Sequence, residues 1–469
     1  MNKNWKTYLL WFAQEHIDFR YAEIESLLSL LKIQMRYVEK PNKDDPYCIV
    51  QFSSEKDVKD LTTRSVSLRS TLELWAHATS IESLHEKMRN YPNTLMEPYL
   101  TADKSFKIEV ETFNRHFSQN EKVDKLENFN YLPVQGPVNL KNPDVLFQYI
   151  EYYGTKANNP PEYPYQVFFG RWIANGLRQL IKKFSLKTRK FIGNTSMDPQ
   201  LSLLMANQAK IKEGDLVLDP FVGSGSLLVA AAQFGGYVLG GDIDYLMLHA
   251  KTRPSRIKQK QREQDESIKA NMKQYNLEHR YIDVLINDFA SVFWNDKLKF
   301  DSIITDPPYG IREATERVGT EKEDCKIKEE HLSTHIPAKI DYSISNLYRD
   351  LLIFSAKFLK IGGRLVVWFP VYREDYSEAG LPSHPALKLV ANCEQTLTKV
   401  TSRRLLTFEK YREPTEEELK KQKSNITDFR EKYFVCREET RKERRMREAK
   451  IREENRIKAL KEIENKTIS

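Results

Sequence analysis

The sequence predicts an α/β protein whose largest part, residues 191–412, folds as a mostly parallel sheet with helices on both faces. Short apolar strands alternate there with longer helical segments, as in "LVLDPF", "GGYVLGGDID", "YIDVLIND", "FDSIITDPPYG" and "GGRLVVWFP". Strands that are apolar along their whole length are typical of parallel strands covered on both faces. A glycine-rich turn, "VGSGS", follows the first strand and precedes a helical segment. Because ligands bind such sheets at the carboxyl ends of the strands, we expect the site at that edge.

Three other segments flank this domain. Residues 1–65 predict a small α/β unit, with an opening strand, a helix through "YAEIESLLSLLK" and a strand at "YCIVQFS". Residues 66–190 alternate helical stretches such as "SIESLHEKMRN" with strands such as "SFKIEVETF". Residues 413–469 are dense in mixed charge and poor in apolar residues, which predicts a solvated single helix or disorder. A chain of 469 residues is long enough for two or three domains.

The charge of the chain favours an anionic partner. The formal net charge is +8 and the pI is near 8.9. The second segment ends in the basic run "GRWIANGLRQLIKKFSLKTRK", whose cations are candidates for contacts with nucleic-acid phosphates. These candidates are Arg171, Lys182, Lys183, Lys187, Arg189 and Lys190. For each of them, an ordinary solvated basic face is the alternative.

The four cysteines lie far apart and form no C-x-x-C pair, which indicates neither a disulfide framework nor a zinc ribbon. The apolar patch "YLLWFA" near the start is interrupted by Gln14, Glu15 and His16, far short of a signal or membrane segment. We therefore expect a soluble protein in the cytoplasm.

One group of cysteine and histidine residues is a candidate metal site. Cys325, His331 and His335 lie in "EDCKIKEEHLSTH", with the two histidines four residues apart. Only three candidate ligands occur in this highly charged loop, so we expect no metal.

The strand ends predict the kind of ligand. Gly223 and Gly225 allow a tight turn and a close approach of the backbone, but Leu228 stands where a dinucleotide-binding turn would have a small residue. Three acids end successive strands, and Phe221 in the turn beside the first acid is counted with them as a cofactor-binding candidate. These acids are Asp219, Asp242 and Asp288. Carboxylates suit a cationic ligand with hydroxyls better than a pyrophosphate, which favours S-adenosylmethionine. Ordinary turn residues at strand ends are the alternative.

The stretch "DPPYGI" forms a stiff corner after the next strand. Its two prolines fix φ and remove two backbone donors, which leaves carbonyls free to accept hydrogen bonds. The domain resembles S-adenosylmethionine-dependent methyltransferases that modify exocyclic amino nitrogens. The resemblance implies that Asp306 and the carbonyl of Pro307 accept hydrogens from the amine, that Tyr309 stacks on the base and that Pro308 stiffens the corner. A structural turn with proline at its second position is the alternative.

The resemblance extends to most of the chain. "SFKIEVETFNRHFSQNEKVDKL", "PVNLKNPDVLFQYIE" and the stretch from "FFGRWIANG" to "SLLMANQA" are similar to the THUMP domain and linker of the tRNA guanosine-10 N2-methyltransferase family, the Trm11-like proteins. In that family the THUMP domain binds the acceptor end of tRNA, and the catalytic domain methylates a guanosine in the D-arm junction. The stretch "GNTSMD" implies that Thr195, Ser196 and Met197 cover the methionine end of the cofactor. From the residues alone, Thr195 or Ser196 would equally serve as a helix N-cap.

The resemblance also implies a small zinc-binding activator subunit as a partner, in addition to tRNA. Two other functions stay open from the sequence. One is methylation of an adenine amine, which the same corner would suit, and the other is a catalytically silent RNA-binding module. The complete set of acids around the expected crevice argues against the silent module.

Overall fold

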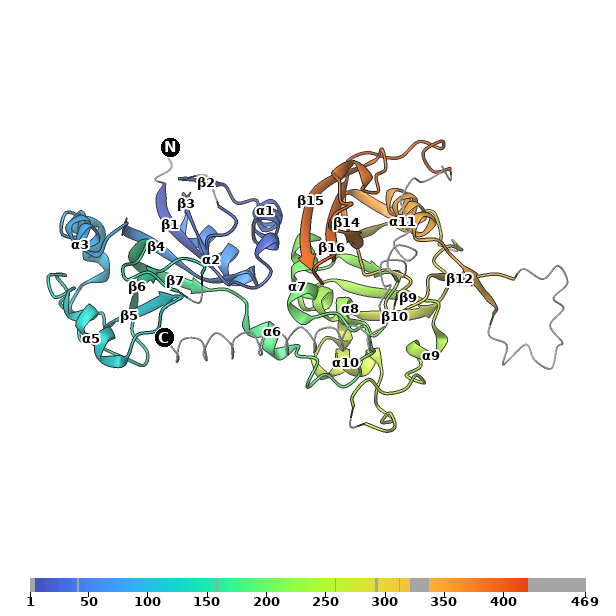
Figure 1. Cartoon of the computed structure of the whole chain (residues 1–469), viewed down its shortest axis with the longest axis horizontal. Helices are drawn as coiled ribbons and strands as arrows, with labels where there is room; N and C mark the ends of the chain where they lie inside the picture. Colours follow the sequence, from blue (N-terminus) through green and yellow to red (C-terminus); the bar gives the residue numbers. More distant parts are fainter. Residues whose placement is uncertain are drawn as a thin grey trace, which may run out of the picture.

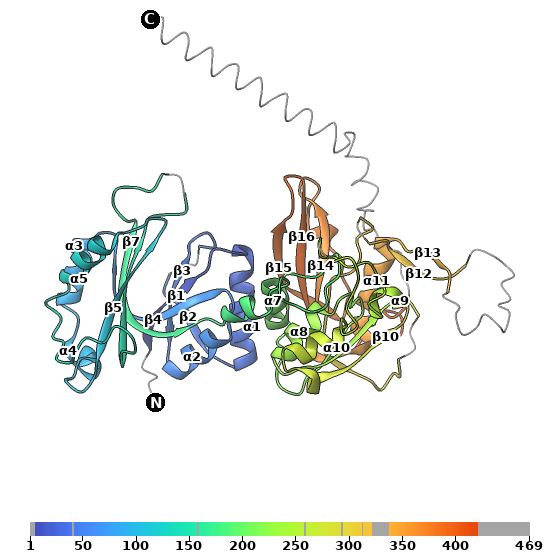
Figure 2. The same ribbon diagram turned by 90° about the horizontal axis from the view of Figure 1, so that it is seen from below.

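The computed structural model describes residues 5–39, 42–156, 159–257, 259–291, 294–311, 313–320 and 337–420. These residues form two halves, each built on a seven-stranded sheet, which lie side by side in both views (Figure 1 and Figure 2). A linker with the short helix α6 (Gln179–Lys183) runs between them. The predicted α/β class is therefore confirmed.

The sheet of the N-terminal half is mostly antiparallel, and only β5 and β6 are parallel neighbours. In spatial order its strands are β2 (Met35–Tyr37), β3 (Tyr47–Phe52), β1 (Lys6–Phe12), β4 (Leu68–Ala78), β7 (Gln166–Asn175), β6 (Val145–Tyr152) and β5 (Phe106–Phe113). Its helices are α1 (Arg20–Leu31), α2 (Glu55–Arg64), α3 (Ile81–Arg89), α4 (Asn93–Met96) and α5 (Gln119–Glu127). The sequence-based boundary at residue 65 does not separate two sheets, because β1 pairs with β3 on one side and with β4 on the other.

The sheet of the C-terminal half is parallel except at one end, where β16 runs antiparallel to both of its neighbours. Its strands in spatial order are β10 (Tyr281–Ile286), β9 (Tyr237–Asp242), β8 (Leu216–Asp219), β11 (Phe300–Thr305), β14 (Leu359–Tyr372), β16 (Thr401–Lys410) and β15 (Leu387–Thr396). Its helices are α7 (Pro199–Gln208), α8 (Ser226–Gln233), α9 (Tyr245–Leu248), α10 (Ile268–Gln274) and α11 (Ile344–Phe358). The short strands β12 (Glu316–Val318) and β13 (Lys339–Asp341) form a separate ribbon.

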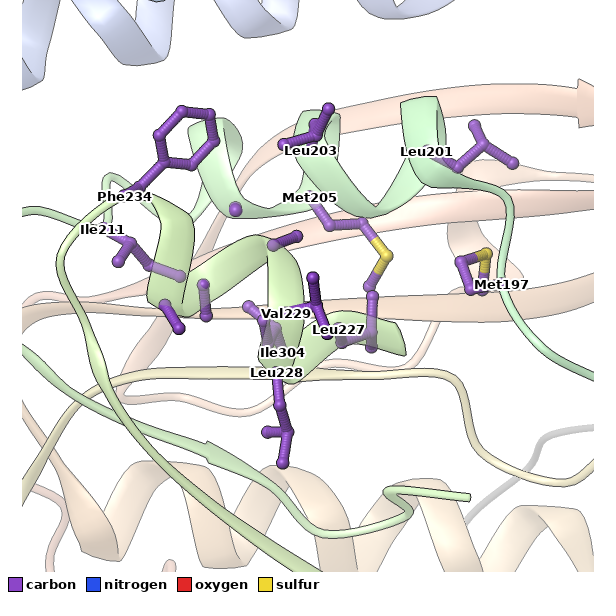
Figure 3. Close-up of a cluster of buried hydrophobic side chains, with 14 of the residues drawn as sticks. Met197, Leu201, Leu203, Met205, Ile211, Leu227, Leu228, Val229, Phe234 and Ile304 are labelled. Carbon is purple, nitrogen blue, oxygen red and sulfur yellow. The ribbon is translucent and has the colours of Figure 1, made fainter. Parts of the chain in front are cut away.

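Consecutive residues of the central strands are buried on opposite faces of this sheet, as the apolar strands predict. Ile304 packs with α7 and α8, whose apolar side chains surround it in Figure 3. Its neighbour Ile303 packs with α11 on the other face. Both faces are thus covered by helices, and the strand ends are left as the place for a site. Among the described helices, none is long and apolar enough to cross a bilayer.

Glu23 of α1 is the centre of the contact between the two halves and is fully buried. Its carboxylate accepts hydrogen bonds from the Ser65 hydroxyl at 2.7 Å, from the Val66 and Ser67 amides at 2.8 and 3.0 Å, and from Asn207 Nδ2 of α7 at 2.6 Å. One carboxylate therefore satisfies four donors that burial has removed from water, and one of these donors comes from the other half.

Two further contacts support this junction. The Arg64 guanidinium donates to Asn207 Oδ1 at 2.9 Å and to the Ile211 carbonyl at 2.6 Å. The ring of Phe19, just before α1, packs against the ring of Trp368 in β14 with the centroids 5.8 Å apart. The N-terminal half therefore contacts the central strands of the C-terminal sheet, as well as its helices.

Candidate active site

The candidate residues gather where the strand order of the C-terminal sheet reverses. From β8 the chain passes outward to β9 and β10 in one direction, and β11 and β14 lie on the other side of β8. Such a switch point leaves a crevice at the carboxyl ends of the strands. Asp219 ends β8, Asp242 ends β9 and Asp306 directly follows β11. The structure therefore brings these three acids to one edge of the sheet.

The glycine-rich turn between β8 and α8 has two left-handed residues, Gly223 at φ 49° and Gly225 at φ 77°. A Cβ on Gly225 would lie 2.7 Å from Cγ2 of Ile268, so this position requires glycine for packing against α10 as well as for its backbone. A Cβ on Gly223 would meet no atom within 4 Å. The turn is thus packed at one glycine and open at the other, where a ligand can approach the backbone.

Asp219 is buried, and its Oδ1 accepts hydrogen bonds from the Thr305 hydroxyl at 2.7 Å and from the Phe221 amide at 3.1 Å. Burial, the largest cause, raises the pKa of Asp219 to about 7 with a contribution from the nearby charges of Asp242 and Asp306, although the two hydrogen bonds oppose the rise. A cationic ligand group placed beside Asp219 would offset the cost of burying its charge. The ring of Phe221 packs on the ring of Phe289 with the centroids 5.2 Å apart.

Asp242 and Asp288 hold the loops around the crevice. Asp242 accepts from the Gly223 amide at 2.8 Å and from the Asp244 amide at 2.9 Å, which ties the glycine turn to β9. Burial raises the pKa of Asp242, and these two amide bonds oppose that shift. Asp288 accepts from the Ala290 and Val318 amides, both at 2.8 Å, and so connects β10 to the β12 strand. Acids at these two strand ends are suited to the ribose hydroxyls, for Asp242, and the adenine amine, for Asp288, of S-adenosylmethionine, and both contacts stay predictions.

The corner after β11 is closed by its own side chains. The Tyr309 hydroxyl donates to Asp306 Oδ1, and Gly310 adopts φ 75° to complete the turn. Pro307 is buried, and Pro308 is half-buried. Burial raises the pKa of Tyr309 well above its ordinary value, and the neighbouring Asp306 raises it further, so the hydroxyl stays a neutral donor. The corner is therefore rigid and keeps its carboxylate in a defined orientation.

Arg403 of β16 also contacts this corner, and no motif in the sequence predicts that contact. Its Nη1 donates to Asp306 Oδ2 at 3.0 Å and lies 3.4 Å from the Tyr309 hydroxyl. The side chain of Asp306 is 24% exposed, and that of Arg403 is 13% exposed. The only available signal was a pair of arginines inside the apolar strand "TSRRLLTF".

The stretch before α7 contacts both the glycine turn and Arg403, which holds the corner after β11. The Ser196 hydroxyl lies 2.6 Å from the Ser224 hydroxyl, and the Gly193 amide donates to it at 2.8 Å. Met197 is buried, and its Sδ lies 3.5 Å from Arg403 Nη2. The role of this stretch as a cover over the methionine end of the cofactor stays a prediction.

Neither Thr195 nor Ser196 caps α7, so the alternative reading of these two residues is wrong. The N-cap is Asp198, whose side chain accepts from the amides of Gln200 at 2.8 Å and Leu201 at 3.1 Å. Thr195 instead donates to Glu313 Oε1 at 3.4 Å.

Two of the six basic candidates do not fit phosphate contacts. Arg171 is buried in β7, where it donates to Glu73 at 2.6 and 2.9 Å and to Glu55 at 2.5 Å. Arg189 is 1% exposed and donates to Ser226 Oγ and to the Phe184 carbonyl, both at 2.9 Å. Both side chains therefore hold the fold together.

The other four candidates are exposed on α6 and the linker that follows it. They are Lys182, Lys183, Lys187 and Lys190. Lys183 lies 3.5 Å from Gln233 Oε1, and Lys190 pairs with Asp265. The contacts of Lys183 and Lys190 are made at the protein surface, so an RNA phosphate could replace them without breaking a buried ion pair.

The residues present fit S-adenosylmethionine. Open space at Gly223, an acid at the end of β8 and another at the end of β9 match its cationic and hydroxyl groups. Asn287, beside Gly241, has a buried Oδ1 without a hydrogen-bond partner among the described residues. An acceptor of this kind suits a ligand hydroxyl or amine. Cys325, His331 and His335 lie outside the described residues, within which no group of metal-ligating side chains gathers.

The switch-point crevice, the glycine turn, the acids at the strand ends and the corner after β11 together define a Rossmann-like, S-adenosylmethionine-dependent methyltransferase. The chain is 46% identical over 438 residues to the tRNA (guanine(10)-N(2))-methyltransferase TRMT11 of Gallus gallus, covering 91% of this chain and 94% of that protein. It belongs to this TRMT11 family.

A second relative and two domain models also match the chain. The identity to the Homo sapiens protein of the same name is 46% over 441 residues, covering 91% of this chain and 95% of that one. Residues 6–178 match the model of the Tmrp11 THUMP N-terminal domain, and residues 187–322 match the RMKL-like methyltransferase domain. The crystal structure of TrmN from Thermus thermophilus is 19% identical with a TM-score of 0.41, covering 86% of this chain and 99% of that one.

Proposed function

We propose that the protein transfers a methyl group from S-adenosylmethionine to the N2 amine of guanosine 10 in tRNA. The observation that carries the proposal is the Asp306–Tyr309 corner, which stands next to the crevice formed by Asp219 and the glycine turn. The relatives that match the chain along more than nine tenths of its length are named for methylation of that atom.

The role of the corner is to hold the amine. An exocyclic amine is a weak nucleophile because its lone pair is delocalised into the ring. Asp306 and the Pro307 carbonyl accept its two hydrogens, which turns the lone pair towards the methyl group that S-adenosylmethionine supplies when bound. An ionised carboxylate has about four acceptor positions, and Tyr309 and Arg403 occupy two of them, so room remains for the amine.

Two further effects favour the reaction. The Asp306 carboxylate stabilises the positive charge that develops on the nitrogen before its proton leaves. Holding the reacting atoms in line at about 3 to 3.5 Å contributes most of the rate. Guanosine 10 must leave the stacked RNA to reach the corner, and the ring of Tyr309 offers it a stacking surface.

Label transfer tests the function directly. We expect methyl-labelled S-adenosylmethionine to label an unmodified tRNA transcript, and digestion to give N2-methylguanosine. A matched transcript with adenosine at position 10, and its pairing partner changed to suit, should receive no label. If digestion gave labelled N6-methyladenosine instead, the substrate would be an adenine amine and not guanosine 10. No label, together with no rise in melting temperature on adding S-adenosylmethionine, would support the silent module instead.

The tRNA would lie along the linker between the halves. The exposed cations Lys182, Lys183, Lys187 and Lys190 would neutralise its phosphates there, with salt-dependent affinity. The THUMP domain of the N-terminal half would bind the acceptor end, so the spacing of the two halves selects the nucleotide that reaches Asp306.

We also propose the small zinc-binding activator subunit as a partner, seated on β10. This strand is at the edge of the C-terminal sheet, and Ile282 and Ile286 on it are about half exposed, at 50% and 51%. Edge strands with apolar side chains suit the addition of a partner strand.

The purified subunit should co-elute with this chain in gel filtration, and Ile282→Glu should abolish the co-elution. The matched control is Ile361→Glu on β14, which is 61% exposed at a distant strand and should leave the complex intact. Co-elution that survives Ile282→Glu would place the subunit on another face. The cytoplasm remains the proposed location, since Cys48 and Cys393 are buried free thiols.

A further inference from the structure

The carboxylate of Asp306 is engaged on both oxygens by its own chain. Tyr309 donates its hydroxyl to Oδ1, and Arg403 donates Nη1 to Oδ2 at 3.0 Å. Tyr309 is three residues away on the same corner, whereas Arg403 comes from β16, 97 residues later. The contact therefore joins the catalytic corner to the antiparallel end of the sheet.

The guanidinium of Arg403 is held by contacts with three side chains besides those of the corner. It lies 3.9 Å from the centre of the Trp368 ring, its Nε donates to Gln395 Oε1 at 2.7 Å, and its Nη2 lies 3.5 Å from Met197 Sδ. Trp368 is fully buried, and its indole Nε1 points at Met205 Sδ at 3.1 Å. A planar cation held by stacking and by an acceptor on its edge has little freedom to turn away from Asp306.

We propose that Arg403 is a positioning residue for Asp306, which fixes the carboxylate in the orientation at which it accepts the target amine. The inference rests on the proposed function, because it assigns a support to the same corner. Arg403 itself does not touch the reacting atoms. Arg403 acts through the Asp306 carboxylate. Because Tyr309 and Arg403 fix that carboxylate, they also set the directions of its two remaining acceptor positions.

The same contact also favours the charged form of Asp306. Burial raises the pKa of Asp306, and the charge of Arg403 lowers it. The other titratable groups that face this pair are Tyr309, Asp219, Tyr348 and His16. Tyr309 and Tyr348 stay neutral because burial raises their pKa values well above the ordinary one, and burial lowers the pKa of His16. Among these groups, Arg403 is thus the cation that opposes protonation of Asp306.

The test compares the pH profiles of Arg403→Gln and wild type in the label-transfer assay. Asp306 must be ionised to accept the amine, so activity falls as the pH drops through its pKa. Without Arg403 that pKa rises, and we expect the acid limb to move up by about one pH unit or more. We also expect kcat on the plateau to fall about 10- to 100-fold because the carboxylate is no longer aligned.

Two variants separate positioning from a general effect on the fold. Arg403→Lys keeps the charge but loses the planar fork, so its acid limb should stay near that of wild type while kcat remains low. Arg404→Gln is the matched control, since Arg404 is the next residue of β16, is equally 13% exposed and also stacks on an aromatic ring, that of Tyr376 at 4.4 Å. It should leave the acid limb in place. An unmoved acid limb in Arg403→Gln would overturn the inference.

A second readout needs no turnover. In protein labelled with ¹³C at aspartate carboxyls, the signal of Asp306 is assigned by its loss in Asp306→Asn and titrated with pH. The inference predicts a higher titration midpoint in Arg403→Gln than in wild type or Arg404→Gln, and equal midpoints would contradict it. Failure of the proposed function would appear separately, as wild-type protein that transfers no methyl group.

Discussion

Asp306→Ala is expected to lower methyl transfer by about 10²- to 10³-fold, the usual effect of removing one preorganised electrostatic group. The alanine has no acceptor for the amine and no charge to stabilise the positive nitrogen. Single-turnover label transfer with saturating tRNA measures the chemical step. The affinity for tRNA, measured by filter retention, should change less than twofold because the expected RNA contacts lie on the linker and the N-terminal half.

Two controls accompany this variant. Asp306→Asn keeps the shape of the side chain and an acceptor for Arg403, so it isolates the charge and should also be slow. Asp296→Ala removes an exposed carboxylate that pairs with Lys357 at 2.7 Å, and it should transfer label at the wild-type rate. If Asp306→Ala lost tRNA binding and catalysis together, the residue would be structural.

Glu23→Ala is expected to destabilise the protein by about 3 to 5 kcal/mol, since it leaves several buried donors without an acceptor. The buried amides of Val66 and Ser67 lose their acceptor, and Asn207 Nδ2 keeps the Arg64 carbonyl at 3.2 Å. A lower melting temperature measures the effect. Methyl transfer at a temperature where the variant is still folded should also fall, because the junction sets the spacing of the two halves.

Glu25→Ala is the matched control for this variant. Glu25 lies two residues after Glu23 on the same helix and is exposed. Its replacement by alanine changes helix propensity as Glu23→Ala does, but it removes no buried hydrogen-bond acceptor. It should shift the melting temperature little. Equal shifts in the two variants would mean that the carboxylate of Glu23 contributes nothing to the junction.

The parts of the site that the sequence reveals are those that depend on neighbours along the chain. Gly223, Gly225 and the two prolines act through local backbone geometry, and Asp219 and Asp242 are placed by ending adjacent strands. Their positions follow once the strands are recognised, because parallel strands bring their carboxyl ends to one edge.

The parts that the sequence conceals depend on contacts between distant segments. Arg403 reaches Asp306 only because β16 inserts beside β14, and a run of amino acids does not show that order. Arg171 and Arg189 look like their exposed neighbours, but each finds buried partners in other elements, Glu73 and Ser226. Pairing of β1 with β4 likewise joins segments on the two sides of residue 65, which composition alone would separate.

The position of β16 also sets an order for biosynthesis. The ribosome releases β15 before β16, yet in the sheet β16 stands between β14 and β15. β15 therefore has no place on the sheet until β16 has emerged, and the two strands must dock together as a hairpin. Because that hairpin carries Arg403, the contact between Arg403 and Asp306 cannot form until both strands have docked beside β14. The corner at Asp306 is therefore completed by a residue that the ribosome adds 97 positions later.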